Sequence, residues 1–267
     1  MNRFKCFFFL SVFTLYGGES LALDGVFDRT AEISHYVEQL NTDLTREQYI
    51  DLSKSIYVSG ISDDTLARAI GDRLIKDIRD LNDYRTASQY GEWMIKALGS
   101  MGTDAAGEYI TRICKMTAVM AIVGQCKETL HRLDWQRRKD QIMASRENYN
   151  EGDDMRVAQL LNLLKSNDLT FKQDATYRMT WDKILDDRLM QEIAKQLQLF
   201  VDRDGISTSK QVYGLMAHYC KLLGYSHDKK YEPLLIAVIK SSAPELLIRS
   251  KAKKAIKRIA DKEPNDE

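Results

Sequence analysis

The chain has 267 residues, and its 39 basic residues balance 39 acidic ones, so no net charge draws it toward nucleic acid or an anionic surface. Its 3 prolines and 14 glycines are too few for the many turns of an all-β sandwich or barrel. With 44% hydrophobic and 29% charged residues, the composition excludes collagen-like and disordered chains. We therefore expect a folded, soluble, helical protein.

The N-terminus has the order of a secretory signal peptide. Arg3 and Lys5 form a basic start, an apolar run follows at 6–16, and small residues precede a cleavage position after Ala22. The run is shorter than the roughly 20 apolar residues that a membrane span needs, and an uncleaved anchor is the alternative. The sequence predicts a signal peptide over 1–22 and export to a periplasm or to the extracellular space.

From Val26 onward, apolar residues recur three and four positions apart, which is typical of amphipathic helices. No segment shows the sustained alternation of a half-buried strand. Aspartate pairs at 63–64 and 186–187 are expected to cap helices, because their carboxylates accept hydrogen bonds from free backbone N–H groups. The helix expected at 119–146 is either continuous or broken near residue 134. The expected helices span 27–40, 45–58, 64–81, 86–99, 105–116, 119–146, 153–165, 170–182, 187–201, 207–223, 229–241 and 245–260.

The helical pattern recurs in the second part of the chain. The segment Ile-Ser-Asp-Asp-Thr-Leu at 61–66 is matched 123 residues later by Ile-Leu-Asp-Asp-Arg-Leu at 184–189. Helical proteins share leucine periodicity, but that periodicity alone does not predict matched Asp-Asp and Leu-Gly turns in the same order. Two further matches, both at an offset of 125, pair 43–45 with 168–170 and 96–99 with 221–224. The sequence predicts a tandem duplication.

The two predicted halves span 23–150 and 151–267. They join at 148–153, where the sequence Asn-Tyr-Asn-Glu-Gly-Asp has one glycine and no proline. A flexible linker between free domains is richer in Gly, Pro or Ser. We therefore expect the halves to stack as one continuous superhelix.

Within each half, the repeating unit is a helix, a tight turn and an antiparallel helix, with the period of about 40 residues that α-solenoids have. The segments Lys-Ala-Leu-Gly-Ser-Met-Gly at 96–102 and Tyr-Cys-Lys-Leu-Leu-Gly-Tyr at 219–225 resemble the turn of HEAT-like repeats, and 109–113 and 234–238 resemble their returning helices. The resemblance covers most of the chain from Leu44 onward. It implies an all-α, curved solenoid of antiparallel helix pairs. The regular inner Asp and Arg of many HEAT repeats are missing, and the period of tetratricopeptide repeats, the rival family, is absent.

Three cysteines follow the predicted signal peptide: Cys114, Cys126 and Cys220. Their spacing is that of neither a CxxC motif nor a zinc site. Cys114 and Cys220 follow apolar helix positions and are expected to be small core residues. A disulfide between Cys114 and Cys126 is the alternative, because both lie on consecutive antiparallel helices.

The sequence contains no recognisable catalytic, cofactor or metal motif. The four histidines, His35, His131, His218 and His227, are isolated, and His218 is expected to lie in the core. No P-loop, GxGxxG or nucleophile elbow is present. The segment 202–205, Asp-Arg-Asp-Gly, resembles a calcium loop, but its spacing favours a turn and helix cap. We expect no cofactor.

Two basic segments stand out on the predicted surface. The run 137–139, together with Arg146, is expected to be an exposed linker face. In the last helix the basic residues either contact an anionic surface or form the solvated face of a terminal cap. The residues with potential anionic-surface contact are Lys251, Lys254, Lys257 and Arg258.

Because solenoids present long concave surfaces, the fold predicts a non-enzymatic scaffold or adaptor with a protein partner and without nucleic acid. The candidate partner-facing residues lie on returning helices: Glu108, Arg112, Glu232 and Lys240. Two alternatives remain open. One is an enzyme with a loop- or cysteine-based site, as the resemblance implies for some chromophore lyases. The other is a membrane-surface protein that uses the basic last helix.

Overall fold

The computed structural model describes residues 27–78, 85–203, 209–241 and 246–261. Within these ranges the chain forms twelve α-helices and a short 3-10 helix, and no strand. The predicted all-α, solenoid-like fold is confirmed. The predicted signal peptide over 1–22 lies outside the described residues.

We call α1–α6 the first half and α7–α12 the second half. The helices of the first half are α1 (Thr30–Leu40), α2 (Arg46–Ser59), α3 (Asp64–Asp77), α4 (Arg85–Gly99), α5 (Asp104–Met116) and α6 (Met120–Ala144). Those of the second half are α7 (Met155–Lys165), α8 (Leu169–Asp182), α9 (Asp187–Asp202), α10 (Lys210–Tyr225), α11 (Glu232–Lys240) and α12 (Leu246–Ala260). Most ends lie within a few residues of the sequence prediction, and α6 is continuous, without a break near residue 134.

Side chains of the residues before the helices fix several of these helix starts. Asp63 accepts a hydrogen bond from the backbone N–H of Leu66, and Asp186 accepts one from Arg188, so the predicted aspartate caps are confirmed. The matched segments 43–45 and 168–170 differ, however. Asp168 caps α8, whereas α2 is capped by Thr45 in a reciprocal pair with Gln48.

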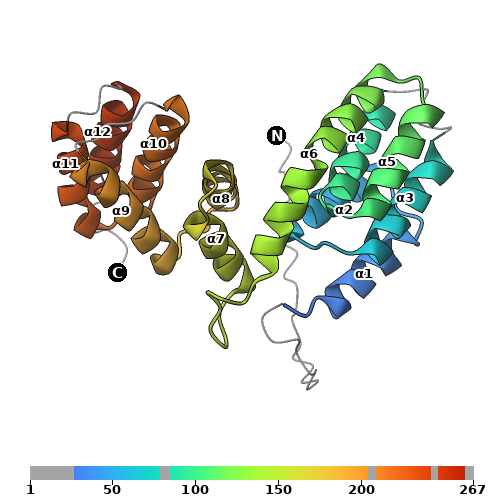
Figure 1. Ribbon diagram of the computed structural model, residues 1–267, viewed down its shortest axis with the longest axis horizontal. Coiled ribbons are helices and arrows are strands. Elements are labelled where there is room, and N and C mark those ends of the chain that lie inside the picture. The colour runs from blue at the N-terminus through green and yellow to red at the C-terminus, as the bar shows by residue number, and fades with distance from the viewer. Residues whose placement is uncertain (1–26, 79–84, 204–208, 242–245, 262–267) are drawn as a thin grey trace, which may run out of the picture.

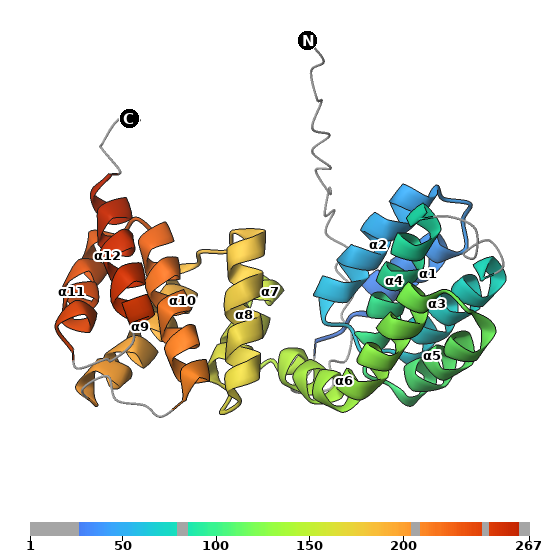
Figure 2. The same cartoon turned by 90° about the horizontal axis from the view of Figure 1, so that it is seen from above.

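The helices form two layers that run along the molecule. In the first half α2 packs against α4 and α4 against α6, while α1 packs against α3 and α3 against α5. In the second half α8, α10 and α12 follow one another in the same way, as do α7, α9 and α11. Figure 2 shows α2, α4 and α6 on the side of the first half that faces the second. We call the even-numbered helices the inner layer and the odd-numbered helices the outer layer.

Two apolar cores lie between these layers, one in each half. The first contains fully buried residues such as Leu66, Ile70 and Leu98. The second contains Leu163, Leu189 and many residues of α10 and α12. The long helix α6 belongs to both, because Leu130 and Leu133 pack on the first core and Trp135, Ile142 and Met143 on the second. Figure 1 shows this helix descending from the first half to the connection with α7.

Contacts between α6 and α8 continue the inner layer across the two halves. The indole Nε1 of Trp135 donates to Thr170 Oγ1 at 2.7 Å, and its ring lies 5.3 Å from that of Phe171. Arg178 on α8 donates to the carbonyl oxygen of Val58 at 3.0 Å. That carbonyl belongs to the last turn of α2, where a cation is favourable and the helix leaves carbonyl groups without intrahelical partners.

The cysteines at 114, 126 and 220 are all free. Cys220 is buried, as expected, whereas Cys114, also expected in the core, is half-buried; Cys126 is buried. The alternative of a disulfide between Cys114 and Cys126 is therefore not realised in the structure. Among the described helices, none has the length and apolar character to cross a membrane.

Candidate functional site

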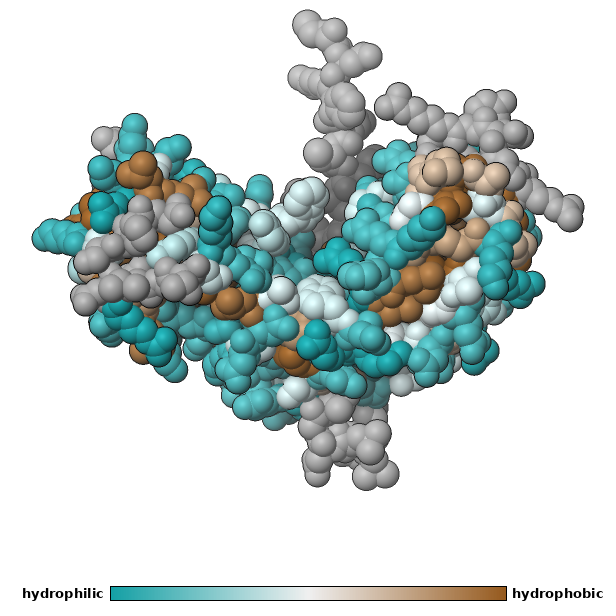
Figure 3. Space-filling model, turned by 45° about the horizontal axis from the view of Figure 1, so that its top comes forward, coloured by the Kyte–Doolittle hydropathy of each residue, from teal (hydrophilic) through white to brown (hydrophobic). Residues whose placement is uncertain are grey.

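The molecule is hollowed between its two halves, and the floor of the hollow is hydrophilic to intermediate in hydropathy (Figure 3). All three tryptophans of the chain lie on inner-layer helices: Trp93 on α4, Trp135 on α6 and Trp181 on α8. None of them is buried. Trp93 and Trp135 are half-buried against the two cores, whereas Trp181 is 87% exposed, and an exposed ring of that size points to a role in binding.

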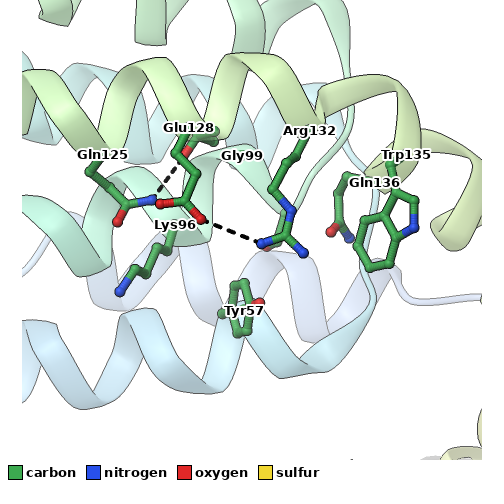
Figure 4. Close-up of a pocket in the computed structure, with 10 residues that line it drawn as sticks. Tyr57, Lys96, Gly99, Gln125, Glu128, Arg132, Trp135 and Gln136 are labelled. Carbon is green, nitrogen blue, oxygen red and sulfur yellow. Dashed lines mark hydrogen bonds and ion pairs between the residues drawn. The ribbon is translucent and has the colours of Figure 1, made fainter. Parts of the chain in front are cut away.

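A pocket of about 80 Å³ opens on the inner layer of the first half (Figure 4). A volume of that kind holds about three water molecules and is smaller than the roughly 300–1,000 Å³ of most small-molecule sites, so a larger ligand would extend out of its mouth. Its walls come from α2, α4 and α6 and combine aromatic, charged and amide side chains. The lining residues are Tyr57, Lys96, Gly99, Ser100, Gln125, Glu128, Thr129, Arg132, Trp135 and Gln136.

The pocket depends on the close approach of α4 and α6. A Cβ atom on Gly99 would overlap Cγ2 of Thr129, so only glycine allows the two helices to pack at this distance. On α6 the lining residues Glu128, Arg132 and Trp135 recur at the three- and four-residue spacing that puts side chains on one face of a helix. The helical repeat therefore carries a row of polar and aromatic groups along one wall.

Two cations and one carboxylate give the pocket a formal charge of +1. Arg132 lies 3.6 Å from Glu128, and Lys96 extends into the pocket from α4 (Figure 4). Gln125 donates to Thr129 at 3.0 Å. Burial raises the pKa of Tyr57, and the nearby carboxylate of Asp174 raises it further, so the phenol remains a hydrogen-bond donor.

Cations lie over the tryptophan rings on both sides of this pocket. Lys54 and Lys96 lie 5.7 and 4.7 Å from the ring of Trp93. Arg132 and Lys139 lie 5.2 and 5.0 Å from the ring of Trp135. The negative face of each ring attracts these cations and holds them beside it.

Next to the pocket, a buried cluster of charged groups joins the two halves. Lys139 is fully buried, and its Nζ lies 3.8 Å from Asp174, which also accepts from Arg178 at 2.8 Å. The neighbouring Asp140 accepts from Gln136 at 2.8 Å. Among the described residues, Lys139 Nζ and Asp140 Oδ2 have no hydrogen-bond partner. Burial lowers the pKa of Lys139 and raises the pKa of Asp140, because it disfavours both charged forms.

This cluster corrects the expectation that the run 137–139 is an exposed linker face. Lys139 is buried against α8, and Arg137 is half-buried with its guanidinium bonded to the Gly102 carbonyl and to Asp104. A basic run on a helix turns about 100° per residue, so its members face different surroundings. Only Arg138 in the run is exposed.

Two wider grooves, of about 690 and 420 Å³, flank the connection between α6 and α7. Their amide groups hold the connection itself. Asn162 donates to the carbonyls of Ile142 and Ser145 and accepts from Asn148, which in turn accepts from Lys165. The pocket differs from these grooves in having a tryptophan contacted by cations in its wall.

No group of three metal-ligating side chains occurs within the described part of the chain. The segment 202–205 that resembles a calcium loop lies partly outside that part. His218, expected in the core, is instead half-buried at the surface of α10, and its Nδ1 has no hydrogen-bond partner among the described residues.

The residues singled out from the sequence lie away from the pocket. Glu108 and Arg112 are exposed on α5, while on α11 Lys240 is exposed and Glu232 half-buried, so all four belong to the outer layer. On α12, Lys254 and Lys257 are exposed and Lys251 and Arg258 are half-buried. The sequence signal that would have found the pocket is the spacing of Glu128, Arg132 and Trp135 at i, i+4 and i+7.

Comparison with known proteins assigns the chain to no family. No family model matches it, and no curated protein matches it. A solved structure that is similar in arrangement is human deoxyhypusine hydroxylase in complex with glycerol, with 14% identity over 85% of this chain and 84% of that chain and a TM-score of 0.32. At that TM-score the activity and ligand of that enzyme are not transferred to this chain.

The comparison does correct one prediction. The solenoid fold led us to expect a non-enzymatic scaffold or adaptor, but the matched helical-repeat chain is an enzyme. An architecture of this kind therefore does not mark a chain as a non-enzymatic scaffold, and that prediction is wrong. Function has to be argued from particular side chains, because one fold supports many activities.

Proposed function

We propose that the chain binds sugar acids, small carbohydrates that carry a carboxylate, in the pocket between α2, α4 and α6. The observation that supports this most is the convergence of two cations, one carboxylate and two aromatic rings around a single polar space. The groups are Lys96, Arg132, Glu128, Tyr57 and Trp135.

The mixture of donors and acceptors favours a ligand with hydroxyl groups. Glu128 only accepts hydrogen bonds, Lys96 and Arg132 only donate, and Gln125 and Gln136 do both. A hydroxyl group both donates and accepts, so it satisfies either kind of partner. A phosphate ion would use the donors and would leave the acceptor oxygens of Glu128 and of the two amides without a partner.

A sugar acid also has a carboxylate and a ring, and the pocket offers partners for both. Arg132 lies 3.6 Å from Glu128, and its planar guanidinium has five N–H donors, which leaves donors for a ligand carboxylate. The rings of Tyr57 and Trp135 flank the guanidinium (Figure 4), so a sugar that bonds to Arg132 lies beside aromatic groups. Apolar walls with a few oriented polar groups are typical of small-molecule sites.

Isothermal titration calorimetry of the full chain with D-galacturonate tests the proposal. We expect binding by the wild type and an affinity about 10- to 100-fold lower for Arg132→Ala, because a charge-assisted hydrogen bond contributes about 1.5–3 kcal/mol. Arg112→Ala on the outer-layer helix α5 is the matched control and should bind as the wild type does. Equal binding by both variants, or no binding by the wild type, would overturn the proposal.

The same samples show whether the ligand is converted. Chromatography of D-galacturonate recovered after incubation gives unchanged ligand if the pocket only binds it. A new product that requires Arg132 would make the chain an enzyme acting on this ligand.

We also propose that the helix pairs are HEAT-like repeats and that 1–22 directs export. The basic, apolar and small-residue order of the segment supports the export proposal. N-terminal sequencing of protein from the native host should find Leu23 first. An intact Met1 on soluble cytosolic protein would contradict export.

A further inference from the structure

The surface of the inner layer continues past the pocket with the same chemistry. On α8, Trp181 is 87% exposed and Tyr177 is 57% exposed. The two lie four residues apart, so they share one face of the helix. On α10, Lys221 and Tyr225 are also four residues apart and place a cation beside a ring.

Tyr225 has the same surroundings as the two tryptophans of the first half. Lys221 and Arg258 lie 5.4 and 4.5 Å from its ring, just as two cations lie over Trp93 and two over Trp135. Arg258 comes from α12, so the arrangement joins the last two inner-layer helices. Three rings in the inner layer are thus each contacted by two cations.

Positive charge also surrounds the ring pair on α8 and α10. The ring of Tyr177 meets that of His218 edge-on at 4.8 Å. Burial lowers the pKa of His218, and Lys221 on α10 and Lys251 on α12 lower it further. His218 is therefore neutral at pH 7, and the two lysines supply the charge at this part of the surface.

These groups lie along one continuous surface. Trp135 contacts α8 through Thr170 and Phe171, α8 packs against α10, and α10 against α12. Because α8 and α10 pack as neighbours, they are about 8–10 Å apart, and the distance from α6 to α10 is longer than that. A ligand that spans this distance is several sugar residues long.

We infer that the inner layer binds an acidic oligosaccharide, with one end in the pocket and the chain extending over Trp181 toward Tyr225. The inference rests on the proposed function, because it assigns the size and charge pattern of the ligand of that pocket. Cations at successive helices match a carboxylate on successive sugars, and exposed rings match their apolar faces.

A single-stranded nucleic acid is the other polymer that combines negative charge with flat rings. Its binding grooves are strongly basic, because phosphates dominate the affinity. This chain has no net charge, and Glu128 and Asp174 lie on the same surface. The carboxylates favour a hydroxyl-rich ligand over a phosphate-rich one.

Calorimetry with D-galacturonate and its dimer and tetramer tests the inference on the full chain. We expect the wild type to bind the tetramer about 10- to 100-fold more tightly than the monosaccharide. Trp181→Ala should weaken tetramer binding roughly 3- to 10-fold and leave monosaccharide binding unchanged. Trp181→Phe should retain most of the tetramer affinity, and Leu199→Ala, an exposed change on the outer layer, should alter neither affinity.

The outcomes separate this inference from the proposed function. If the tetramer binds no better than the monosaccharide, or Trp181→Ala leaves its affinity unchanged, the extended site is overturned while the pocket stands. If neither sugar binds, both proposals fail. Binding of hexauridylate or hexaglutamate, without binding of the galacturonate tetramer, overturns the inference and assigns the surface to another anionic polymer.

Discussion

The two halves share a plan of six helices in two layers, but their inner surfaces differ. In the first half the rings of Trp93 and Trp135 are half-buried beneath cations. In the second half, Trp181 and Tyr177 are 87% and 57% exposed. The inner layer thus has a walled pocket at one end and an open aromatic surface at the other. Such a layer suits a ligand that is held at one end and stacked along its length.

The halves also differ in how their helices begin. Asp63 and Asp186 cap α3 and α9 in the same way, whereas Asp168 caps α8 and its counterpart Asp43 caps nothing. Matched positions of the two halves therefore differ at a helix start as well as on the inner surface.

The largest effect is expected from placing a charge in the core of the second half. Leu161 on α7 is 5% exposed, so Leu161→Asp should lower the free energy of unfolding by about 3–5 kcal/mol. Urea denaturation followed by tryptophan fluorescence measures this. Leu199→Asp, at a residue 49% exposed on α9, is the control and should cost less than about 1 kcal/mol. Equal effects of the two variants would show that α7 does not carry the second core.

A stabilising effect is expected from removing the buried lysine between the halves. Lys139→Met should raise the free energy of unfolding at pH 7 by up to about 3 kcal/mol, because burial disfavours the charged lysine and Asp174 keeps its bond to Arg178.

The size of that effect should depend on pH. Burial lowers the pKa of Lys139 from 10.5 to about 8, so between these values the folded chain binds fewer protons than the unfolded chain. The wild type therefore gains stability as the pH rises through this window, and the advantage of Lys139→Met should shrink. Denaturation curves at pH 7 and pH 10 check this. A destabilised variant at pH 7 would mean that the lysine is needed to hold the halves together.

A smaller effect on the free energy of unfolding is expected from removing Asp168, which caps a helix, than from the changes above, and a still smaller one from removing its counterpart Asp43. Asp168→Ala should lower the free energy of unfolding by about 1 kcal/mol, because it leaves a backbone N–H of α8 without a partner. Asp43→Ala should change it by less than about 0.5 kcal/mol, because Asp43 has only a solvent-exposed contact with Arg73 at 3.8 Å. Equal costs, measured by thermal unfolding, would mean that the two positions are equivalent after all.

The smallest effect on stability is expected at the open end of the inner layer. Trp181→Ala should leave the free energy of unfolding unchanged within about 0.5 kcal/mol, because an 87% exposed ring contributes little burial. Chemical denaturation against the wild type measures it. A loss of 2 kcal/mol or more would make Trp181 a packing residue and would remove the main argument for the open surface.

The sequence predicted the fold far better than the site. Apolar spacing and the aspartates at 63 and 186 placed the helices correctly, because caps and periodicity are local properties of the chain. The exact end of α2 and its cap at Thr45 were missed, since several nearby residues can serve as caps.

The pocket could not be predicted because it depends on which helix faces are brought together. Tyr57, Lys96 and Arg132 are far apart in the chain and meet only after α2, α4 and α6 have packed. Lys139 was expected to be exposed, because a basic run gives no sign of which residue meets α8. Outer-layer residues such as Arg112 were chosen instead, since helical periodicity alone does not identify the inner layer.

The most direct test uses the chain's three tryptophans as reporters of the inner layer. Their indole N–H signals are resolved by nitrogen-15 NMR and assigned with single Trp→Phe variants. We predict that D-galacturonate shifts the signal of Trp135 and leaves that of Trp181 in place, whereas the galacturonate tetramer shifts both. An unchanged Trp135 signal at saturating concentrations of either sugar would contradict the account.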